Sequence, residues 1–501
     1  LFIMKTINHW IHGTHQSSAA DRRGKIFNPA TGQVIAELPM GNAEDLEKAV
    51  NSASNAFLAW SKSSLTKRTQ IMFRYKQLLE ENRKILTQLI NLEHGKVLSD
   101  AAGSLQRGIE VVDFACGIPH LLKGEFSEQV GTGVDCYNTR QPIGICAGVT
   151  PFNFPAMVPM WMFPIAIMCG NTFILKPSEK DPSCAMKLAE LMKEAGLPDG
   201  VFNVVHGDKE MVDAILDHRE IKTFSFVGST PVAQYVHSKA SENGKRVQAL
   251  GGAKNHAIVL PDADMEQTAN AIIGAAYGSA GERCMAISVV VAVDSIADQF
   301  RDLLVSKANA LSIGPGDEDK NDMGPLITAE HKQKVLQYID DGVSSNAELV
   351  LDGRSHPIAS ENPGFFMGPT LFDHVKTDMK IYLEEIFGPV LVIVRVKNFE
   401  EGIALANNHQ FGNGVALFTS KGSYAREFVN RVQVGMVGIN IAIPVPLSFY
   451  SFGGWKDSIY GDSNIYGEEG VRFYTRIKTV TTRWPDIKEE SKIDLSMPVI
   501  E

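Results

Sequence analysis

The chain has 501 residues, an apolar content of 44% and a formal net charge of −10. That length exceeds one ordinary core, so we expect two or more domains. The acidic balance argues against the basic face of a nucleic-acid binder, although local sites for small anions remain compatible with it. We therefore expect no nucleic-acid partner.

Apolar runs and cysteines exclude further classes. The most apolar run, residues 157–170, is shorter than the roughly 18 residues of a membrane span and holds two prolines, so we expect a buried segment and no membrane partner. The cysteines are scattered without a zinc-binding spacing, which predicts no metal site and reduced thiols. With no signal-peptide pattern, we expect a cytoplasmic protein, or a mitochondrial matrix protein if the chain is a processed eukaryotic form.

The first hundred residues show helical periodicity. Residues 42–60 open on Asn42, a favourable N-cap, and repeat apolar residues at helical spacing. Residues 64–96 predict a pair of amphipathic helices that end before Gly95.

From residue 140 the pattern changes to short apolar strands separated by helices. Strands are predicted at 143–151, 171–178, 201–207 and 222–229, with helices at 181–196 and 209–218. This alternation predicts a parallel, doubly wound sheet. A second alternation follows Leu260, with strands at 286–294, 388–396 and 415–420. We therefore expect an α/β protein with two such domains, divided near 255–262.

Two strand-to-helix turns can serve a nucleotide. Gly228 and Ser229 end a strand before a predicted helix, where free backbone N–H groups can hold a phosphate. Lys176 and Glu179 follow another strand and can bracket a ribose, with the acid favouring NAD over NADP. Taken alone, the first pattern is more typical of a turn that binds nothing, and the second is more typical of a solvated loop.

Asn153 and Cys284 are candidate catalytic residues. Asn153 directly follows a strand, where its amide can donate to an oxyanion or simply close a turn. Cys284 lies in the small-residue stretch "SAGERCMA" and follows Arg283. That arginine can lower the thiol pKa, hold an anionic substrate or reach solvent. A lone cysteine is otherwise inert packing.

Seven motifs occur in an order and spacing that resemble the aldehyde dehydrogenase superfamily. The resemblance extends from residue 28 to residue 484, and its motifs are "FNFP", "LKPSEKDP", "FVGSTPVA", "LGG", "GERC", "EEIFGPV" and "SFGGWKDS". It implies two doubly wound α/β domains plus a small β extension for oligomerisation.

The resemblance also implies a role for individual residues. Cys284 corresponds to the family's nucleophile, and Asn153 with the Cys284 backbone N–H to its oxyanion hole. The residues implied to bind NAD are Phe152, Lys176 and Glu179 (the last two at the adenine ribose), Gly228 and Ser229 (pyrophosphate), Glu385 (nicotinamide ribose) and Phe387 (beside the nicotinamide ring).

One departure from the family pattern concerns the water-activating base. Most hydrolytic members carry a glutamate before Leu-Gly-Gly, where this chain has Ala249. A methyl group cannot take a proton from water, so we expect slow hydrolysis unless Glu282 or another base substitutes. A thiol acceptor needs less help, and coenzyme A is the expected co-substrate.

That departure, with "GAKNH" and "GERCMAIS", resembles the methylmalonate-semialdehyde dehydrogenase branch. Its members oxidise methylmalonate or malonate semialdehyde with NAD, lose carbon dioxide and form propionyl-CoA or acetyl-CoA. Arg107 and Arg283 resemble its carboxylate-binding arginines, and two guanidiniums can hold a carboxylate in a fork.

The resemblance implies a domain division as well. The NAD-binding domain is expected at 1–124 and 142–256 with part of 446–476, and the catalytic domain at 257–445. Segments 125–141 and 477–501 match the family's oligomerisation strands and imply a homotetramer built as a dimer of dimers, or a dimer.

Three other functions compete with this interpretation. A hydrolytic aldehyde dehydrogenase for another small aldehyde would turn over without coenzyme A. A cysteine acyltransferase or thioesterase would leave Glu179, Gly228 and Glu385 unexplained. A non-catalytic protein of the same fold would not need Cys284, Asn153 and Glu385, all of which are present.

Overall fold

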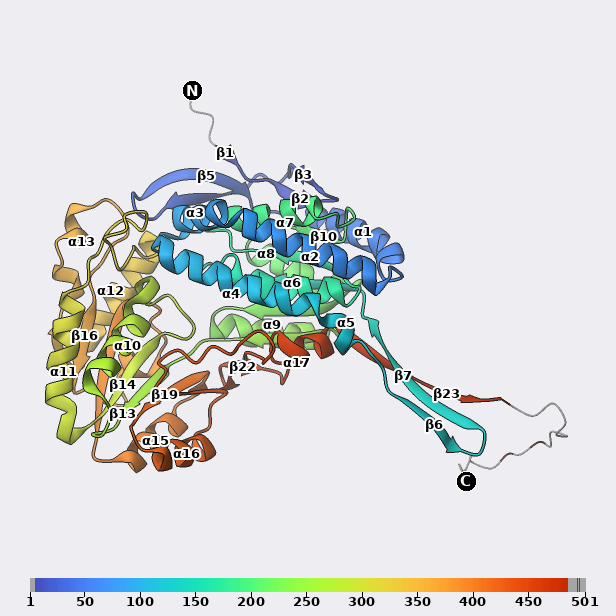
Figure 1. Cartoon of the computed structure of the whole chain (residues 1–501). Coiled ribbons are helices and arrows are strands. Elements are labelled where there is room, and N and C mark those ends of the chain that lie inside the picture. Colours follow the sequence, from blue (N-terminus) through green and yellow to red (C-terminus); the bar gives the residue numbers. More distant parts are fainter. Residues whose placement is uncertain (1–4, 485–492, 494, 496–501) are drawn as a thin grey trace.

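The computed structural model describes residues 5–484, 493 and 495, whose strands form two large sheets and three small ones (Figure 1). The first large sheet runs in the order β22-β12-β11-β8-β9-β10-β2-β3. Its strands are β22 (Ile459–Tyr460), β12 (Arg246–Leu250), β11 (Ile221–Val227), β8 (Ile145–Val149), β9 (Thr172–Lys176), β10 (Phe202–Val204), β2 (His9–Ile11) and β3 (Thr14–Gln16). From β12 to β10 all pairs are parallel, which confirms the predicted α/β class.

The second large sheet runs in the order β15-β16-β17-β14-β13-β19-β20, and parallel pairs join its strands from β16 to β20. Its strands are β15 (Glu348–Leu351), β16 (Thr370–Asp373), β17 (Val390–Val396), β14 (Ile287–Val293), β13 (Asn255–Val259), β19 (Gly414–Phe418) and β20 (Met436–Ile439). The chain passes from the first sheet to the second between Leu250 and Asn255.

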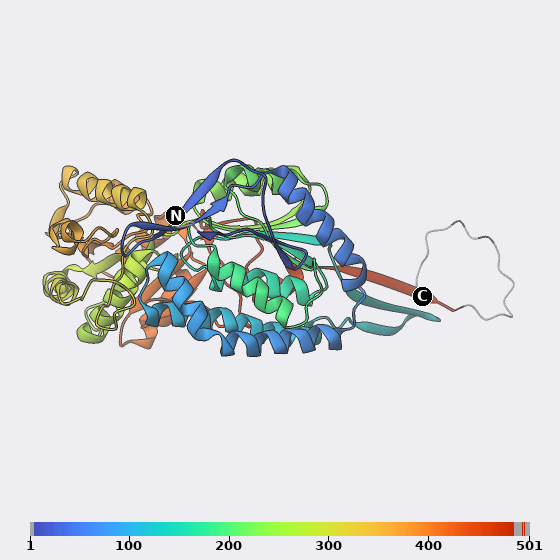
Figure 2. The same cartoon turned by 90° about the horizontal axis from the view of Figure 1, so that it is seen from above.

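Helices cover both faces of the first sheet (Figure 2). In the first half of the chain they are α1 (Ala43–Trp60), α2 (Leu65–Glu81), α3 (Arg83–His94), α4 (Leu98–Cys116), α5 (Ile118–Leu121), α6 (Met157–Met168), α7 (Ser183–Glu194), α8 (Lys209–Asp217) and α9 (Thr230–Glu242). The second half of the chain contains α10 (Met265–Tyr277), α11 (Asp294–Asn309), α12 (Ala329–Ser344), α13 (Ile358–Glu361), α14 (Lys380–Leu383), α15 (Phe399–Asn408), α16 (Gly422–Arg431) and α17 (Gly467–Phe473), of which α10, α11, α12 and α15 pack against the second large sheet.

The sequence signals at the N-terminal helices are confirmed. Asn42 caps α1 in a capping box with Asp45, which satisfies free N–H groups at the helix start. The predicted pair is α2 and α3, and Gly95 ends α3 in the left-handed conformation with φ of 90°. The apolar run around residue 160 is α6, buried along its whole length. Within the described residues, no helix combines the length and apolarity that crossing a membrane requires.

Three small sheets complete the fold. One is β1 (Lys5–Thr6), β5 (Gln33–Pro39) and β4 (Arg23–Asn28), and another is β18 (Phe411–Gly412) with β21 (Trp455–Lys456). The third pairs β6 (Phe126–Gly131), β7 (Val134–Pro142) and β23 (Thr475–Arg483), and it projects from the body in both views (Figures 1 and 2). We call this projecting sheet the flap.

Asn171 ties both roots of the flap to the body. Its Oδ1 accepts hydrogen bonds from the backbone N–H groups of Ile143 and Gly144, at 2.7 and 3.0 Å, just after β7. Its Nδ2 donates to the carbonyl oxygens of Ala166, at 3.0 Å, and of Tyr474, at 2.8 Å, just before β23. The side chain is fully buried, so these four bonds have no competition from water.

We predict that Asn171→Ala lowers the free energy of unfolding by about 3 kcal/mol or more, because each buried polar group left unpaired costs about 1–3 kcal/mol. Urea denaturation measures this change. Asn51→Ala, at an exposed asparagine whose Nδ2 donates to Glu47 at 3.2 Å, is the matched control and should stay within about 0.5 kcal/mol of the wild type. Equal effects of the two substitutions would contradict the assignment.

Candidate active site

Cys284 lies in a loop between a 3-10 turn, η1 (Gly278–Gly281), and β14. Ser279, Ala280 and Gly281 all have positive φ, at 54°, 52° and 75°. A Cβ at Gly281 would lie 2.2 Å from the carbonyl oxygen of Gly388, so only glycine fits there. The glycine in the small-residue stretch before Cys284 is therefore required by the path of the loop.

Two amides hold the cysteine in place. The Cys284 carbonyl oxygen accepts hydrogen bonds from Nδ2 of Asn255, at 2.9 Å, and Nδ2 of Asn413, at 3.1 Å. Asn255 also donates to the carbonyl of Ala286 at 2.9 Å. The sequence analysis did not single out either asparagine. Asn255 belongs to the "GAKNH" stretch, whereas Asn413 gives no local signal.

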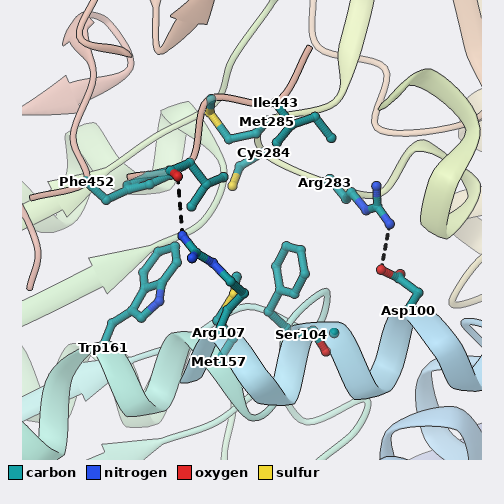
Figure 3. Close-up of a pocket in the computed structure, with 13 residues that line it drawn as sticks. Asp100, Ser104, Arg107, Met157, Trp161, Arg283, Cys284, Met285, Ile443 and Phe452 are labelled. Carbon is teal, nitrogen blue, oxygen red and sulfur yellow. Dashed lines mark hydrogen bonds and ion pairs between the residues drawn. The ribbon is translucent and has the colours of Figure 1, made fainter. Parts of the chain in front are cut away.

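Cys284 borders two cavities. One, of about 290 Å³, is lined by residues of α4 and α6 and by both candidate arginines (Figure 3). The other, of about 20 Å³, is lined by Glu385 and Phe387 as well as Cys284. Cys284 therefore borders both a cavity with the two arginines and a cavity with two of the predicted NAD-binding residues, and Arg283 lines both.

The resting thiol is not activated by its neighbours. Burial raises the pKa of Cys284 to about 12, the nearby Glu385 carboxyl adds to this, and Arg283 only slightly opposes it. Lowering of the thiol pKa is therefore not the main effect of Arg283. Arg283 therefore either holds an anionic substrate or reaches solvent, and its surroundings decide between these two roles.

Arg283 reaches the large cavity instead of bulk solvent. Its Nη2 donates to Oδ1 of Asp100 at 2.6 Å, and its side chain is 19% exposed. A Cβ at Gly278 would lie 2.6 Å from Nη1 of Arg283, so the glycine makes room for the guanidinium. These contacts favour the binding of an anion in the cavity.

Arg107 lies elsewhere in the same cavity. Its Nη1 donates to Oε2 of Glu110 at 2.7 Å, and its Nη2 donates to the carbonyl of Pro446 at 2.6 Å. Figure 3 places the two guanidiniums apart, each with its own partner. The structure thus puts both arginines in one cavity, but it does not join them into the single fork that the sequence analysis expected.

Helix α4 supplies one wall of this cavity. Asp100, Gly103, Ser104 and Arg107 line it at the i, i+3, i+4, i+7 spacing of one helix face. Sequence analysis identified Arg107 but missed Asp100, because the partner of Asp100 lies 183 positions away in the chain.

Asn153 lies directly beside the nucleophile loop. Its Nδ2 donates to the carbonyl oxygen of Glu282 at 3.1 Å, and its own carbonyl accepts a hydrogen bond from Nζ of Lys96 at 2.7 Å. An amide group carries two N–H donors, so the bond to Glu282 leaves capacity for a second acceptor. This geometry is compatible with the predicted oxyanion role.

Glu282 is placed poorly for the substitute base that the sequence analysis considered. Its side chain is fully buried, its Oε1 accepts the backbone N–H of Ile327 at 3.1 Å, and His94 and His331 each lie 3.6 Å from its carboxyl. Burial raises the pKa of Glu282 to about 8, so the group is mostly protonated at neutral pH. It is not among the residues that line either cavity beside Cys284.

Ala249 faces the wrong side of its strand for the role of the missing base. Its side chain belongs to the core that contains Phe224 and Val236, under α9. The next residue of β12, Leu250, points to the opposite face and belongs to the core that holds Met285 and against which Cys284 packs. We therefore correct the expectation: the Ala249 side chain is directed away from the core against which Cys284 packs, and Leu250, which is directed into that core, also lacks a proton-accepting group.

The remaining NAD-binding candidates lie at the ends of strands. Lys176 ends β9, and its Nζ lies 3.1 Å from Oε2 of Glu179. Gly228 and Ser229 join β11 to α9, and the Ser229 side chain does not cap the helix, which leaves N–H groups available to a phosphate. Glu385 accepts the Ala253 N–H at 3.0 Å. This donor set suits the adenosine, diphosphate and ribose groups of NAD.

Phe152 and Phe387 pack against each other. Their rings meet edge to face, with centroids 5.9 Å apart, and Nε2 of His331 donates a hydrogen bond to the Phe387 carbonyl at 2.6 Å. Phe387 has a φ of 59°, a conformation that costs energy outside glycine and that needs such support. Its place beside the small cavity at Cys284 is compatible with the predicted contact to the nicotinamide ring.

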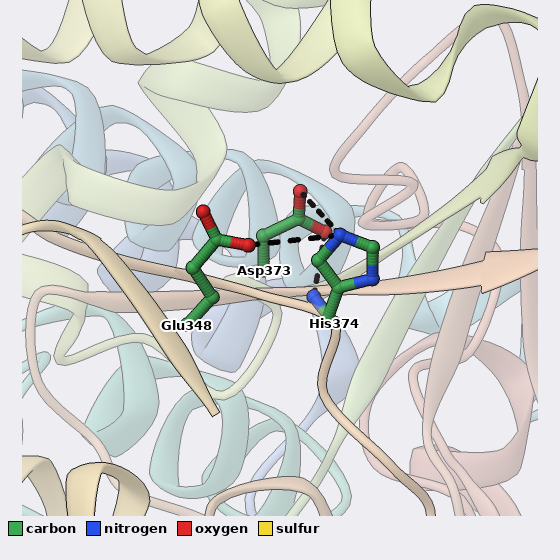
Figure 4. A group of neighbouring side chains, drawn as sticks. All are labelled: Glu348, Asp373 and His374. Atoms are coloured by element: carbon green, nitrogen blue, oxygen red, sulfur yellow. Dashed lines mark hydrogen bonds and ion pairs between the residues drawn. The ribbon is translucent and has the colours of Figure 1, made fainter. Parts of the chain in front are cut away.

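One group of side chains away from this site has the spacing of metal ligands. Glu348, Asp373 and His374 bring ligand atoms within 4.8 Å of one another (Figure 4). The Asp373 carboxylate already accepts hydrogen bonds from Arg395, at 2.6 and 3.1 Å, and Arg301 lies 3.5 Å away. Two guanidiniums repel a further cation, so we assign no metal to this group.

Comparisons with known proteins agree with this geometry. The model of the aldehyde dehydrogenase family matches residues 15–480. A Pseudomonas aeruginosa protein named malonate-semialdehyde dehydrogenase is 53% identical over 496 residues, which cover 99% of this chain and 100% of the relative.

Two solved structures are similarly close. One, named methylmalonate-semialdehyde dehydrogenase, is from Sinorhizobium meliloti in complex with NAD; it has a TM-score of 0.96 and 51% identity, covering 98% of this chain and 100% of that one. Another of that name, from Oceanimonas doudoroffii, has a TM-score of 0.95 and 52% identity, covering 96% and 99%. The resemblance seen in the motifs is thereby confirmed over nearly the whole chain: the protein belongs to the aldehyde dehydrogenase family.

Proposed function

We propose that this enzyme oxidises malonate semialdehyde or methylmalonate semialdehyde with NAD and transfers the acyl product to coenzyme A. The observation that carries the proposal is the position of Cys284 between a cavity with two arginines and a cavity lined by Glu385 and Phe387. The first suits a short aldehyde that ends in a carboxylate. The names of the relatives support the same substrate class.

The chain's own residues define the chemistry. The Cys284 thiol loses its proton to solvent as its sulfur attacks the aldehyde carbon, and Asn153 Nδ2 with the Cys284 backbone N–H hold the resulting oxyanion. Glu385 and Phe387 would hold the nicotinamide end of NAD beside Cys284, where the cofactor would supply the acceptor for the hydride of that carbon; loss of the hydride leaves a thioester on Cys284. The substrate carboxylate binds in the cavity that Arg283 and Arg107 line from separate positions, because guanidinium donors match carboxylate oxygens.

Decarboxylation belongs to the thioester stage of the reaction. There the carboxylate is β to a thioester carbonyl, so loss of carbon dioxide leaves an enolate whose oxygen can accept the same donors. Protonation of the enolate carbon gives an acetyl group from malonate semialdehyde, or a propionyl group from its methyl derivative.

Transfer to coenzyme A follows from the residues around Cys284. Leu250 cannot deprotonate water, and Glu282 is turned away and mostly protonated. Water is therefore a poor acceptor for the acyl group, whereas a thiolate needs no base at the moment of attack.

We further propose a homotetramer, built as a dimer of dimers through the flap, with the domain boundaries expected from the sequence. Exposed apolar side chains on the flap, Phe126 at 64% and Ile477 at 57%, support burial against another copy. Of the oligomerisation segment expected at 477–501, the structure describes residues 477–484, 493 and 495, and the other residues of that segment lie outside the described part of the chain. The separation of the two large sheets supports the division into domains.

We predict sustained NADH formation from malonate or methylmalonate semialdehyde only when coenzyme A is present, because the acyl-enzyme otherwise accumulates. Absorbance of NADH under steady-state conditions measures this, with succinate semialdehyde as a longer-chain control. Equal rates with and without coenzyme A would instead support a hydrolytic aldehyde dehydrogenase.

We also predict that Leu250→Glu raises the rate of NADH formation without coenzyme A, because it places a general base on the face of β12 directed toward Cys284. General-base assistance is worth about 10²–10⁴-fold, so even a partly aligned carboxylate should give at least about a tenfold gain. Leu250→Gln, equal in shape but without the base, is the control and should stay slow. A gain of the same size in both variants would sink the assignment of Leu250.

A further inference from the structure

A chain of polar contacts connects Arg283, which lines the large cavity, to Asn153 beside the nucleophile loop. Arg283 donates to Oδ1 of Asp100 at 2.6 Å, and Oδ2 of the same carboxylate lies 3.7 Å from Nζ of Lys96. Lys96 in turn donates to the Asn153 carbonyl at 2.7 Å. One aspartate is thus shared by two cations, one of which faces the substrate cavity.

Lys96 carries its charge in an unusual environment, the protein interior. Its side chain is fully buried, and its ammonium lies 4.3 Å from the centre of the Phe154 ring. Burial lowers the pKa of Lys96, while Asp100 works against that shift. Buried lysines are rare unless paired, so the ammonium needs Asp100, the Asn153 carbonyl and the aromatic face together.

The charges of this group do not balance. Lys96 and Arg283 are two cations, and Asp100 is a single anion between them. The neighbouring Glu282 carboxyl adds little compensation, because burial raises its pKa to about 8. Arg107 is already matched by Glu110. One positive charge is left at the cavity, and a substrate carboxylate would neutralise it.

We propose that Lys96 is a specificity-determining positioning residue, which by sharing Asp100 leaves Arg283 incompletely neutralised and so selects aldehydes that carry a carboxylate. Without Lys96, Asp100 would cancel the charge of Arg283 at close range. This inference rests on the proposed function, because it explains how that site distinguishes its substrate from a neutral aldehyde. Lys96 acts through Asp100 and Arg283 and does not touch the substrate.

The proposal predicts opposite effects of two substitutions on the preference for a carboxylate. Lys96→Met removes a cation and should weaken the preference for a carboxylate. Adding Asp100→Asn to that variant removes the anion, leaves Arg283 alone and should restore the preference. If Lys96 merely supported the fold, the double variant would not regain the preference for a carboxylate, since a second buried substitution in the same group would only add damage.

The preference can be measured without turnover. The reagents 3-bromopropanoate and 3-bromopropanamide have nearly the same shape, and both alkylate the Cys284 sulfur with loss of bromide. Their reacting carbon stands at the same distance along the chain from the carboxyl carbon as the aldehyde carbon of malonate semialdehyde. The ratio of the two rates at Cys284, followed by peptide mass spectrometry, cancels any change in the reactivity of the thiol itself.

We expect the ratio of the carboxylate to the amide reagent to fall about fivefold or more in Lys96→Met, since loss of one nearby charge changes a binding free energy by about the amount of one charge-assisted hydrogen bond. In Lys96→Met/Asp100→Asn it should return to within about twofold of the wild type. Lys76→Met is the matched control. Lys76, on α2, pairs at the surface with Asp113, which lies on the same helix as Asp100, α4. This substitution should leave the ratio unchanged.

An unchanged ratio in Lys96→Met, or a double variant as unselective as the single one, would overturn the proposal. Circular dichroism verifies folding, and Lys96→Gln replaces the methionine variant if that protein does not fold. Wild-type NADH formation from malonate semialdehyde is measured alongside. If the wild type turns over but the ratios do not move, only this inference fails; if the ratios move as expected without turnover, only the proposed function fails.

Discussion

The position of Cys284 depends on the two amide groups that hold its carbonyl oxygen. Asn255 opens β13 and Asn413 directly precedes β19, so the hydrogen bonds fix the nucleophile loop to the edge where neighbouring strands of the second sheet begin. Asn153, at the end of a strand of the first sheet, approaches the same loop from the other side through the Glu282 carbonyl. The reacting sulfur therefore lies where the two sheets meet, and it borders two cavities. A loop with bulkier residues could not follow this path, because Gly281 lies against the backbone of Gly388.

The charge balance at Cys284 and Glu385 differs from that around Arg283. Burial keeps the thiol neutral at rest and raises the pKa of Glu385 to about 7. On the substrate side, every charged group has at least one partner, yet cations exceed anions around Arg283. A pocket with this excess binds an anionic end group without leaving a buried charge unpaired when the substrate departs.

Local signals in the sequence predicted the local features of the fold. The capping box at Asn42, the glycine after α3 and the alternation of apolar strands with helices depend on neighbouring residues, and each was confirmed. Cys284, Asn153 and the two arginines were recognised because their motifs are contiguous or match a known family. Cys284 and the two arginines line one cavity, and Asn153 bonds to the loop that carries Cys284, which supports those assignments.

What the sequence could not predict depends on contacts between distant residues or on the phase of a strand. Asp100 and Lys96 acquire meaning only when α4 packs beside the nucleophile loop, far along the chain. Asn413 gives no signal until β19 pairs with β13. The error at Ala249 is one residue of register, and in a strand one residue turns a side chain to the opposite face. Glu282 was considered as a base because it is near Cys284 in sequence, but its side chain points into a buried group of histidines.

The central claim is that Cys284 carries the acyl group until a thiol removes it. The most direct measurement is mass spectrometry of the denatured enzyme after incubation with malonate semialdehyde and NAD but no coenzyme A. The account predicts an acetyl or malonyl adduct on the Cys284 peptide that disappears when coenzyme A is added before denaturation. An unmodified Cys284 despite NADH formation, or an adduct that water removes as fast as coenzyme A does, would contradict it.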